Sequence, residues 1–175
     1  MKNIGITTII LLFSFVTSFC QWGNTIELSS KISTELHEIK NFSKISASDD
    51  FIVYVDFSNN QEEIRIEANE NLHEYIIVEK EGDLLKLRTR GYSTKSKLGV
   101  SEKLVAHITA KKLTAIIGDD DAEIELMSEL SSDNLDISLD SDATLKGEIE
   151  VTALVINLDE DAAVSYTHLT LPTKA

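Results

Sequence analysis

The chain has 175 residues and carries 30 acidic against 16 basic side chains, a formal net charge of -14. A surface this acidic repels nucleic-acid phosphates and anionic membranes, so the composition excludes nucleic acid and lipid surfaces as expected partners. Residues 21–162 have the length of one domain, and neither a proline nor a low-complexity linker divides them. We therefore expect a single folded unit.

Residues 1–20 have the layout of a secretory signal peptide: Lys2, an apolar run, then small residues up to Cys20. The run is too short for a convincing membrane span. We therefore expect an exported protein with no membrane span after signal removal, in the periplasm, on the outer-membrane surface or outside the cell. A lipoprotein would instead be anchored at Cys20, but Phe19 is unusual before such an anchor. Cleavage after Cys20 leaves no cysteine for a disulfide or a thiolate metal site.

Period-two alternation of apolar and polar residues dominates the next part of the chain and predicts an all-β protein. The clearest strands are expected at 51–57, 64–68 and 85–87. Residues 91–97 are polar and glycine-led, which predicts an exposed, mobile loop. Only residues 30–39 hint at a helix, and their polar spacing is too irregular to predict one.

From Leu104 onward an Asp-x-Asp-Ala element recurs, and its alanines are spaced by 21 and then 19 residues. A period of about 20 residues with short apolar strands and polar corners is typical of a β-solenoid with one coil per repeat. A flat antiparallel sheet is the structural alternative. In the middle coil we expect an inward-facing set made of Leu135, Ile137, Leu139, Ala143, Leu145, Ile149 and Val151.

The order of several weak motifs resembles the head GIN domain family of putative autotransporter adhesins, exported proteins common in Bacteroidota. The matching residues are Phe42, Ile45, Phe51, Val53 and Val55, then 64–72, 82–87, Val105, Thr109 and Leu113, and the repeats at Ile116, Ile137 and Ile156. The resemblance implies a right-handed β-helix-like fold and an envelope or extracellular setting, but no established activity. It also implies further coils, because the family tends to run longer.

The acidic corners depart from that family, which often has Ser-Gly-Ala there. In a solenoid, equivalent carboxylates of adjacent coils lie about 4.8 Å apart, and like charges at about 5 Å in water repel by roughly 0.8 kcal/mol. One hypothesis is a Ca²⁺ ladder, since Ca²⁺ takes carboxylate and carbonyl oxygens. The other is structural, since Asp bonds nearby backbone N–H groups at turns. The candidate metal ligands are Asp119, Asp121, Asp140, Asp142, Asp159 and Asp161.

The last residues differ from everything before them. Residues 164–173 contain no acidic residue and resemble translated read-through of a transposase-type sequencing adapter, and Ala163 fits the codon that such an adapter would complete. We therefore expect residues 163–175 to be non-native and the β-solenoid domain, residues 21–162, to be incomplete at its C-terminus. An ordinary strand and turn is the alternative. An uncapped last coil exposes strand edges, which predicts end-to-end self-association.

Catalysis has little support in the sequence. A carbohydrate-active β-helix enzyme needs paired carboxylates or a base at defined positions, and His37, His73 and His107 are scattered. Aromatic residues suited to glycan stacking are also ungrouped: Trp22, Tyr54, Tyr75 and Tyr92. We expect a non-catalytic adhesion or scaffold protein whose partner is an envelope protein or a glycan, with no cofactor unless the corners bind calcium.

Overall fold

The computed structural model describes residues 24–95 and 98–170. The predicted signal peptide, Cys20 and Trp22 lie outside these residues. The elements are β1 (Asn24–Glu27), β2 (Ile32–His37), β3 (Lys44–Ala47), β4 (Ile52–Phe57), β5 (Glu63–Asn69), η1 (Glu70–Tyr75), β6 (Ile76–Glu81), β7 (Leu84–Thr89), β8 (Tyr92–Lys95), β9 (Leu104–Ala110), β10 (Ala115–Gly118), β11 (Glu123–Leu126), β12 (Leu130–Leu139), β13 (Thr144–Leu158) and β14 (Ala163–Thr170).

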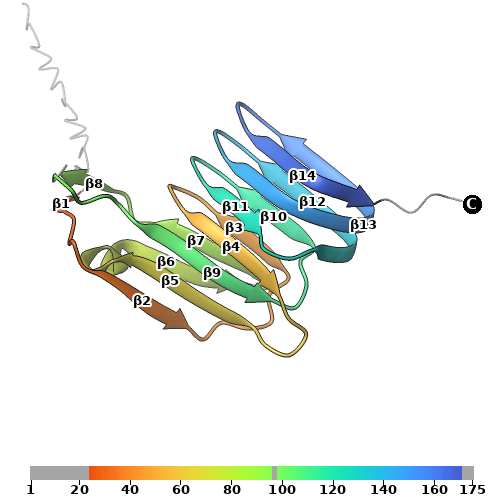
Figure 1. Cartoon of the computed structure of the whole chain (residues 1–175), viewed down its shortest axis with the longest axis horizontal. Coiled ribbons are helices and arrows are strands. Elements are labelled where there is room, and N and C mark those ends of the chain that lie inside the picture. The colour runs from red at the N-terminus through yellow and green to blue at the C-terminus, as the bar shows by residue number, and fades with distance from the viewer. Residues whose placement is uncertain (1–23, 96–97, 171–175) are drawn as a thin grey trace, which may run out of the picture.

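The described strands form an all-β structure, as the alternation predicts. Apart from the β1–β8 pair, they belong to one mixed sheet with the order β2-β5-β9-β4-β11-β13-β12-β10-β3-β7-β6, and β14 pairs with β13. The long strand β13 pairs with β11 at its start and with β12 from Ile149 onward. The sheet therefore turns back on itself at β13, and its two layers face each other along the long axis of the molecule (Figure 1).

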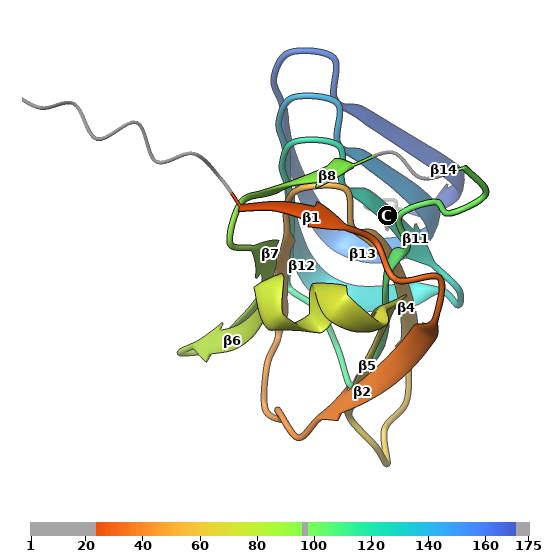
Figure 2. The ribbon, with the colours of Figure 1, turned by 90° about the vertical axis from the view of Figure 1, so that its left-hand side faces the viewer.

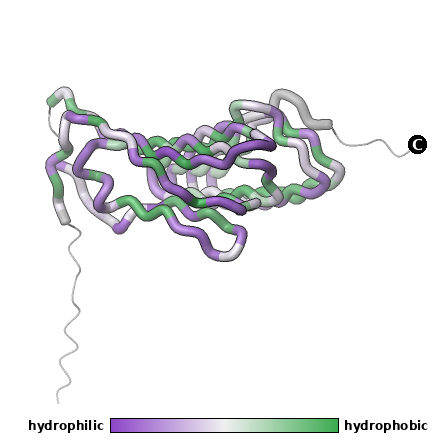
Figure 3. Tube along the Cα trace, turned by 90° about the horizontal axis from the view of Figure 1, so that it is seen from below, coloured by the Kyte–Doolittle hydropathy of each residue, from purple (hydrophilic) through white to green (hydrophobic). Residues whose placement is uncertain are grey.

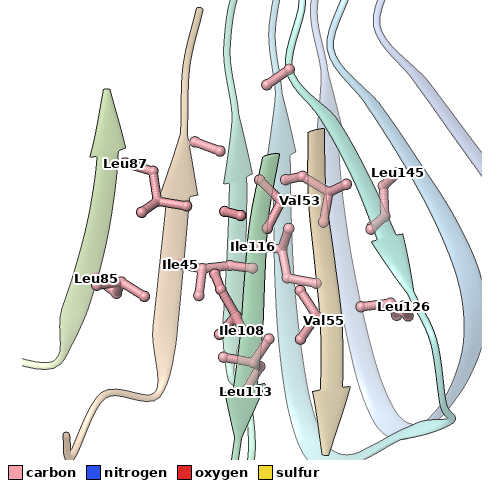
Figure 4. Close-up of a cluster of buried hydrophobic side chains, with 14 of the residues drawn as sticks. Ile45, Val53, Val55, Leu85, Leu87, Ile108, Leu113, Ile116, Leu126 and Leu145 are labelled. Atoms are coloured by element: carbon pink, nitrogen blue, oxygen red, sulfur yellow. The ribbon is translucent and has the colours of Figure 1, made fainter. Parts of the chain in front are cut away.

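The core lies between these two layers. Alternate side chains point inward, and Figure 4 shows Ile45 and Ile116, from the neighbouring strands β3 and β10, in one apolar cluster with Val53 from β4. The hydropathy of the chain alternates along the strands accordingly (Figure 3). All seven residues predicted to face inward in the middle repeat are buried: Leu135, Ile137, Leu139, Ala143, Leu145, Ile149 and Val151.

The N-terminal end of the core is covered by η1 and the β1–β8 pair (Figure 2). Leu28 and Leu72 pack there in a second apolar cluster. The buried Asn69 holds this cover in place: its Nδ2 donates to the Ser29 carbonyl at 2.8 Å, and its Oδ1 accepts from the Lys103 N–H at 2.7 Å. A buried amide with its groups paired in this way links segments that are distant in sequence.

One weak local signal and one local prediction differ from the structure. Residues 30–39 contain strand β2, not a helix, because β2 pairs antiparallel with β5 along its whole length. Residues 92–95 form strand β8 within the predicted loop, because β1 lies beside them in parallel register. Both are decided by a pairing partner far along the chain, which can override weak local preference. The described residues contain no helix with the length and apolar character needed to cross a membrane.

The C-terminal end of the core has no such cover among the described residues. Ile156 and Leu158 follow the inward-facing register of Ile137 and Leu139, yet they are 38% and 48% exposed. Residues 163–170 continue the sheet as β14, parallel to β13. Their backbone is therefore that of an ordinary strand. The non-native origin expected for residues 163–175 stays a prediction.

Candidate functional site

The Asp-x-Asp-Ala columns of the sequence align in space. Ile116 lies beside Ile137, and Ile137 lies beside Ile156, in parallel register. The corners, defined as residues 48–51, 119–122, 140–143 and 159–162, form a row along one edge of the molecule (Figure 1). Backbone bonds connect them, because Asp140 N–H donates to the Gly118 carbonyl at 3.1 Å and Asp159 N–H donates to the Leu139 carbonyl at 3.0 Å.

The first aspartate of each predicted corner makes the turn. Oδ1 of Asp119, Asp140 and Asp159 accepts the next residue's N–H at 2.8, 2.7 and 2.9 Å, respectively. The residue that donates has a positive φ of 54°, 57° and 53° in the three turns. Such a conformation is unfavourable for most residues, and a side-chain acceptor placed beside it stabilises the turn. The structural reading of the corners therefore has a specific geometric basis.

A fourth corner, at residues 48–51, was missed by sequence reasoning. Strand β3 pairs with β10 and β4 pairs with β11, so residues 48–51 stand where 119–122 stand in the next repeat. Asp49 has the equivalent positive φ of 60°. The available signal was Ile45-Ser-Ala47 before two aspartates, but Ser48 and Phe51 replace the expected Asp and Ala, and residues 52–118 separate this corner from the next.

The structure does not gather the six predicted ligands into a metal centre. They lie on exposed turns, and the residues that the structure describes contain no group of three or more His, Cys, Asp and Glu that could hold a metal ion. One carboxylate oxygen of Asp119, Asp140 and Asp159 is already bonded within its turn. Calcium binding by Asp119, Asp121, Asp140, Asp142, Asp159 and Asp161 stays a prediction.

Acidic groups of two adjacent corners meet around Asp50. Partial burial, and then the charges of Asp121, Asp49 and Asp120, raise the pKa of the Asp50 carboxyl. The neighbouring Tyr92 hydroxyl donates to Glu102 Oε1, and burial and this bond raise the pKa of Tyr92. Asp49, Asp50, Tyr92 and Glu102 line a hollow of about 220 Å³. Stacked corners thus bring like charges close enough to disfavour ionisation of one of them.

A second surface feature is a row of outward side chains that crosses the sheet, here called the Tyr54 row. Its members occupy directly opposed positions on neighbouring strands, from β13 through β11, β4, β9 and β5 to β2. Opposed side chains on one face lie close enough to contact each other. The row is Lys146, Glu125, Tyr54, His107, Arg65 and Leu36.

The Tyr54 row carries two rings and a guanidinium at its centre and an exposed apolar side chain at its edge. The Tyr54 and His107 rings stack with centroids 5.5 Å apart and planes at 27°. The Arg65 side chain is 54% exposed and pairs with Glu63 through Nε at 2.9 Å. Leu36 at the edge is 60% exposed. This mixture of aromatic, Arg and apolar groups resembles the composition of recognition surfaces.

A hollow of about 250 Å³ opens in this row, lined by Thr34, Arg65, Glu67 and His107. Lys103 Nζ donates to Glu67 Oε1 at 2.7 Å, and this bond lowers the pKa of Glu67, so its carboxylate is ionised and accepts hydrogen bonds. The hollow therefore offers a hydroxyl, an acceptor and a guanidinium donor beside a stacked pair of rings. Sequence reasoning missed it, because these groups come from β2, β5 and β9.

A further hollow, of about 620 Å³, lies where the chain bends between the layers. It is lined by Lys112, Thr114, residues 131–134 and residues 150–152. Its lining has hydroxyls, an amide and both signs of charge but no aromatic ring. It can hydrogen-bond a polar ligand but gives no flat apolar surface for stacking.

The structure brings together two of the histidines that look scattered in the sequence. His73 Nδ1 lies 3.6 Å from Glu35 Oε2. Burial lowers the pKa of His37; Glu35 opposes this effect and His73 adds to it. Within residues 24–95 and 98–170, no hydrogen bond is observed from His37, His73 or His107 to a serine, threonine or cysteine side chain.

The sequence model of one protein family, described as "Putative auto-transporter adhesin, head GIN domain", matches residues 41–167. A search of the curated proteins found no match to this chain. Among solved structures, the chain is similar to a putative adhesin from Parabacteroides merdae, with a TM-score of 0.73 and 21% identity over 84% of this chain and 60% of that one.

Two other crystal structures give the same answer about the fold. A putative adhesin from Parabacteroides distasonis has a TM-score of 0.72 and 16% identity, over 83% of this chain and 60% of that one. One from Bacteroides fragilis has a TM-score of 0.59 and 15% identity, over 81% of this chain and 98% of that one. The chain spans 60% of the length of the two Parabacteroides proteins. With the family match covering most of the described residues, this chain belongs to the head GIN domain family of putative auto-transporter adhesins.

Proposed function

We propose that this chain is an exported, non-catalytic protein of the cell envelope or cell surface, with an adhesion or scaffold role toward an envelope protein or a glycan. The observation that carries the proposal is the Tyr54 row, an exposed face that presents rings, a guanidinium and an apolar side chain together. Family membership supports the same reading. A flat mixed face of this kind suits binding better than covalent chemistry, which needs a buried and aligned nucleophile and base.

We also propose that the parallel strands wind as a right-handed β-solenoid. The repeated register Ile45, Ile116, Ile137 and Ile156 supports it, as do the four equivalent corners. In such an architecture each repeat covers the apolar side of its neighbour. The exposed Ile156 and Leu158 at the last repeat then favour a second copy of the chain as an end-to-end partner.

The interaction role is tested by incubating fluorescently labelled chain with bacterial and animal cells and measuring bound fluorescence against unlabelled competitor. We expect saturable binding to at least one surface. Matched cell samples treated with protease or with periodate, which cleaves vicinal diols of sugars, identify which surface component holds the chain. Binding that never saturates would contradict the proposal, as would turnover of an oligosaccharide by the purified chain.

The export proposal is tested with residues 1–23 fused to alkaline phosphatase, an enzyme that is active only outside the bacterial cytoplasm. We expect phosphatase activity from this fusion. A control with Leu11→Lys and Leu12→Lys interrupts the apolar run on which a signal peptide depends, and we expect it to be inactive. Equal activity of the two fusions would contradict export through this segment.

A further inference from the structure

We propose that the hollow of the Tyr54 row binds one sugar ring of a neutral glycan chain. This proposal rests on the proposed interaction function and names the class of its ligand. A pyranose has an apolar C–H face and a rim of hydroxyls. The ring of His107, which lines the hollow and is held by stacking on Tyr54, gives the C–H face a flat surface. The rim of hydroxyls finds both hydrogen-bond donors and acceptors around the hollow, on Thr34, Arg65 and Glu67.

The ion pairs around the hollow favour a neutral ligand with hydroxyl groups over a charged ligand. Arg65 is held at 2.9 Å by Glu63, and Lys103 is held at 2.7 Å by Glu67. An incoming carboxylate or sulfate would therefore find these cations already neutralised, and the net charge of -14 would repel an anionic polymer. A neutral sugar avoids both problems, because hydroxyls hydrogen-bond to charged groups without adding charge.

The size of the hollow fits one sugar ring of a longer chain. Its volume of about 250 Å³ lies below the roughly 300–1,000 Å³ of sites that enclose a whole drug-sized ligand. The exposed Leu36 and the rest of the open face leave room for the neighbouring sugars on either side. The larger hollow at residues 131–134 has no ring to stack on, so it is the weaker site for a sugar.

A single ring on an open face binds weakly, with a dissociation constant on the order of 1 mM. Saturation-transfer difference NMR detects binding in that range. The purified chain would be mixed with neutral hexasaccharides of glucose, of mannose and of galactose, and with hexagalacturonate as the anionic comparison. We expect magnetisation transfer to at least one neutral hexasaccharide and none to hexagalacturonate.

Two variants locate the site, and one variant is a matched control. We expect His107→Ala and Arg65→Ala, two residues that line the hollow, each to weaken binding about tenfold or more, since aromatic and Arg anchors carry most of the affinity of such surfaces. Both positions are on the surface, and a thermal unfolding curve of each variant verifies the fold. Asn134→Ala, in the larger hollow, should leave binding unchanged.

The proposal is overturned if no neutral hexasaccharide binds, if hexagalacturonate binds more tightly, or if Asn134→Ala and not His107→Ala abolishes binding. It is also overturned if cell binding depends on His107 but is removed by protease and not by periodate, because the Tyr54 row would then hold a protein. In that case the interaction function stands and only the glycan is wrong. Absence of saturable cell binding would instead overturn the interaction function, whatever the NMR result.

Discussion

Phe51 occupies in the first corner the position that Ala122 occupies in the second. The Phe51 carbonyl accepts from Glu123 N–H at 2.9 Å, and the Ala122 carbonyl accepts from Thr144 N–H at 2.9 Å. Both side chains are fully buried. One backbone position therefore holds a large ring near the covered N-terminal end of the core and a methyl group in the next repeat, where the space left between the layers differs.

This relationship predicts a large stability loss for Phe51→Ala. Truncating a buried Phe removes its burial and leaves a cavity, so we expect the free energy of unfolding to fall by about 3–5 kcal/mol. Urea denaturation measures it. Met127→Ala, at a 59% exposed position in the bend that follows β11, is the control and should change stability by less than about 0.5 kcal/mol. Equal effects of the two substitutions would contradict the assignment of Phe51 to the core.

Two glycines should resist enlargement for different reasons. A Cβ at Gly118 would lie 2.8 Å from Leu139 Cδ2 and 3.1 Å from Ala143 Cβ, so Gly118→Ala should cost about 1–3 kcal/mol by overpacking. A Cβ at Gly147 would lie 2.5 Å from Leu126 Cβ at a φ of 148°, so Gly147→Ala should cost more.

Gly82→Ala separates strain from overpacking in this comparison. Gly82 also has a positive φ, 64°, but an added Cβ meets no atom within 4 Å. The cost there is backbone strain alone, roughly 1–2 kcal/mol. Chemical denaturation of the three variants should rank Gly147→Ala as the most destabilised. The close packing of β13 on β11 would be refuted if Gly82→Ala were worse.

The corner aspartates should act through their turns. Replacing Asp140 by Ala removes the acceptor of the Ser141 N–H, and we expect a loss of about 1 kcal/mol by analogy with helix caps. The loss should be equal with calcium and with chelator. Asp142→Ala makes a matched control, since no turn bond to the Asp142 carboxylate is observed within the described residues.

The calcium hypothesis makes a separate prediction about thermal unfolding at fixed ionic strength. A ligand that binds only the folded state stabilises it by about 2.7 kcal/mol at a hundredfold excess over Kd, which shifts Tm by several degrees. Such a shift, lost when Asp140 and Asp142 are changed to Asn, would make the corners a metal site. An unchanged Tm leaves them as turns.

Asp50 should make stability depend on pH. Its pKa is raised in the folded protein, so folding favours the protonated form, and the contribution of Asp50 to stability falls as pH rises from the ordinary aspartate range through the raised value. Asp50→Asn should therefore have a higher Tm than the unchanged chain at neutral pH, with the difference disappearing in acid.

Asp56 provides the control of opposite sign. A hydrogen bond from Ser128, and then one from the Phe57 N–H, lower the pKa of its carboxyl. The stabilisation is present above the ordinary aspartate range and is lost as pH falls through the lowered value. Asp56→Asn should be the less stable chain at neutral pH. Thermal unfolding of both variants from acid to neutral pH measures the sign of each change in Tm. If both substitutions raise Tm at neutral pH, or both lower it, the opposite pKa shifts of Asp50 and Asp56 are refuted.

The uncovered end of the core should drive self-association. Ile156 and Leu158 are exposed in the inward register, and unpaired strand edges beside apolar groups favour pairing with another chain. Sedimentation velocity should give a mass that rises with concentration. Ile156→Lys combined with Leu158→Lys should stay monomeric, with Ile32→Lys at the opposite end as the control. A chain that is monomeric at every concentration would rule the contact out.

The prediction of strands and of the core succeeded because both depend on local pattern. Leu135, Ile137 and Leu139 alternate with polar residues, and a period of two allows one inward face only. The turns at Asp119, Asp140 and Asp159 could be read in the same way, since a carboxylate that bonds the next N–H is a local device. The weak helical signal at residues 30–39 was also local, but there the partner strand β5 decided the outcome.

The sequence by itself therefore determined the all-β class, the inward residues, three of the four corners and the family. Only the tertiary structure decided that residues 48–51 are a fourth corner and that Tyr54, His107 and Arg65 lie side by side. The physical reason is that strand neighbours are chosen by hydrogen bonds and packing between segments separated by a long stretch of chain. No local pattern records that choice, so a surface made from several strands exists only once they have paired.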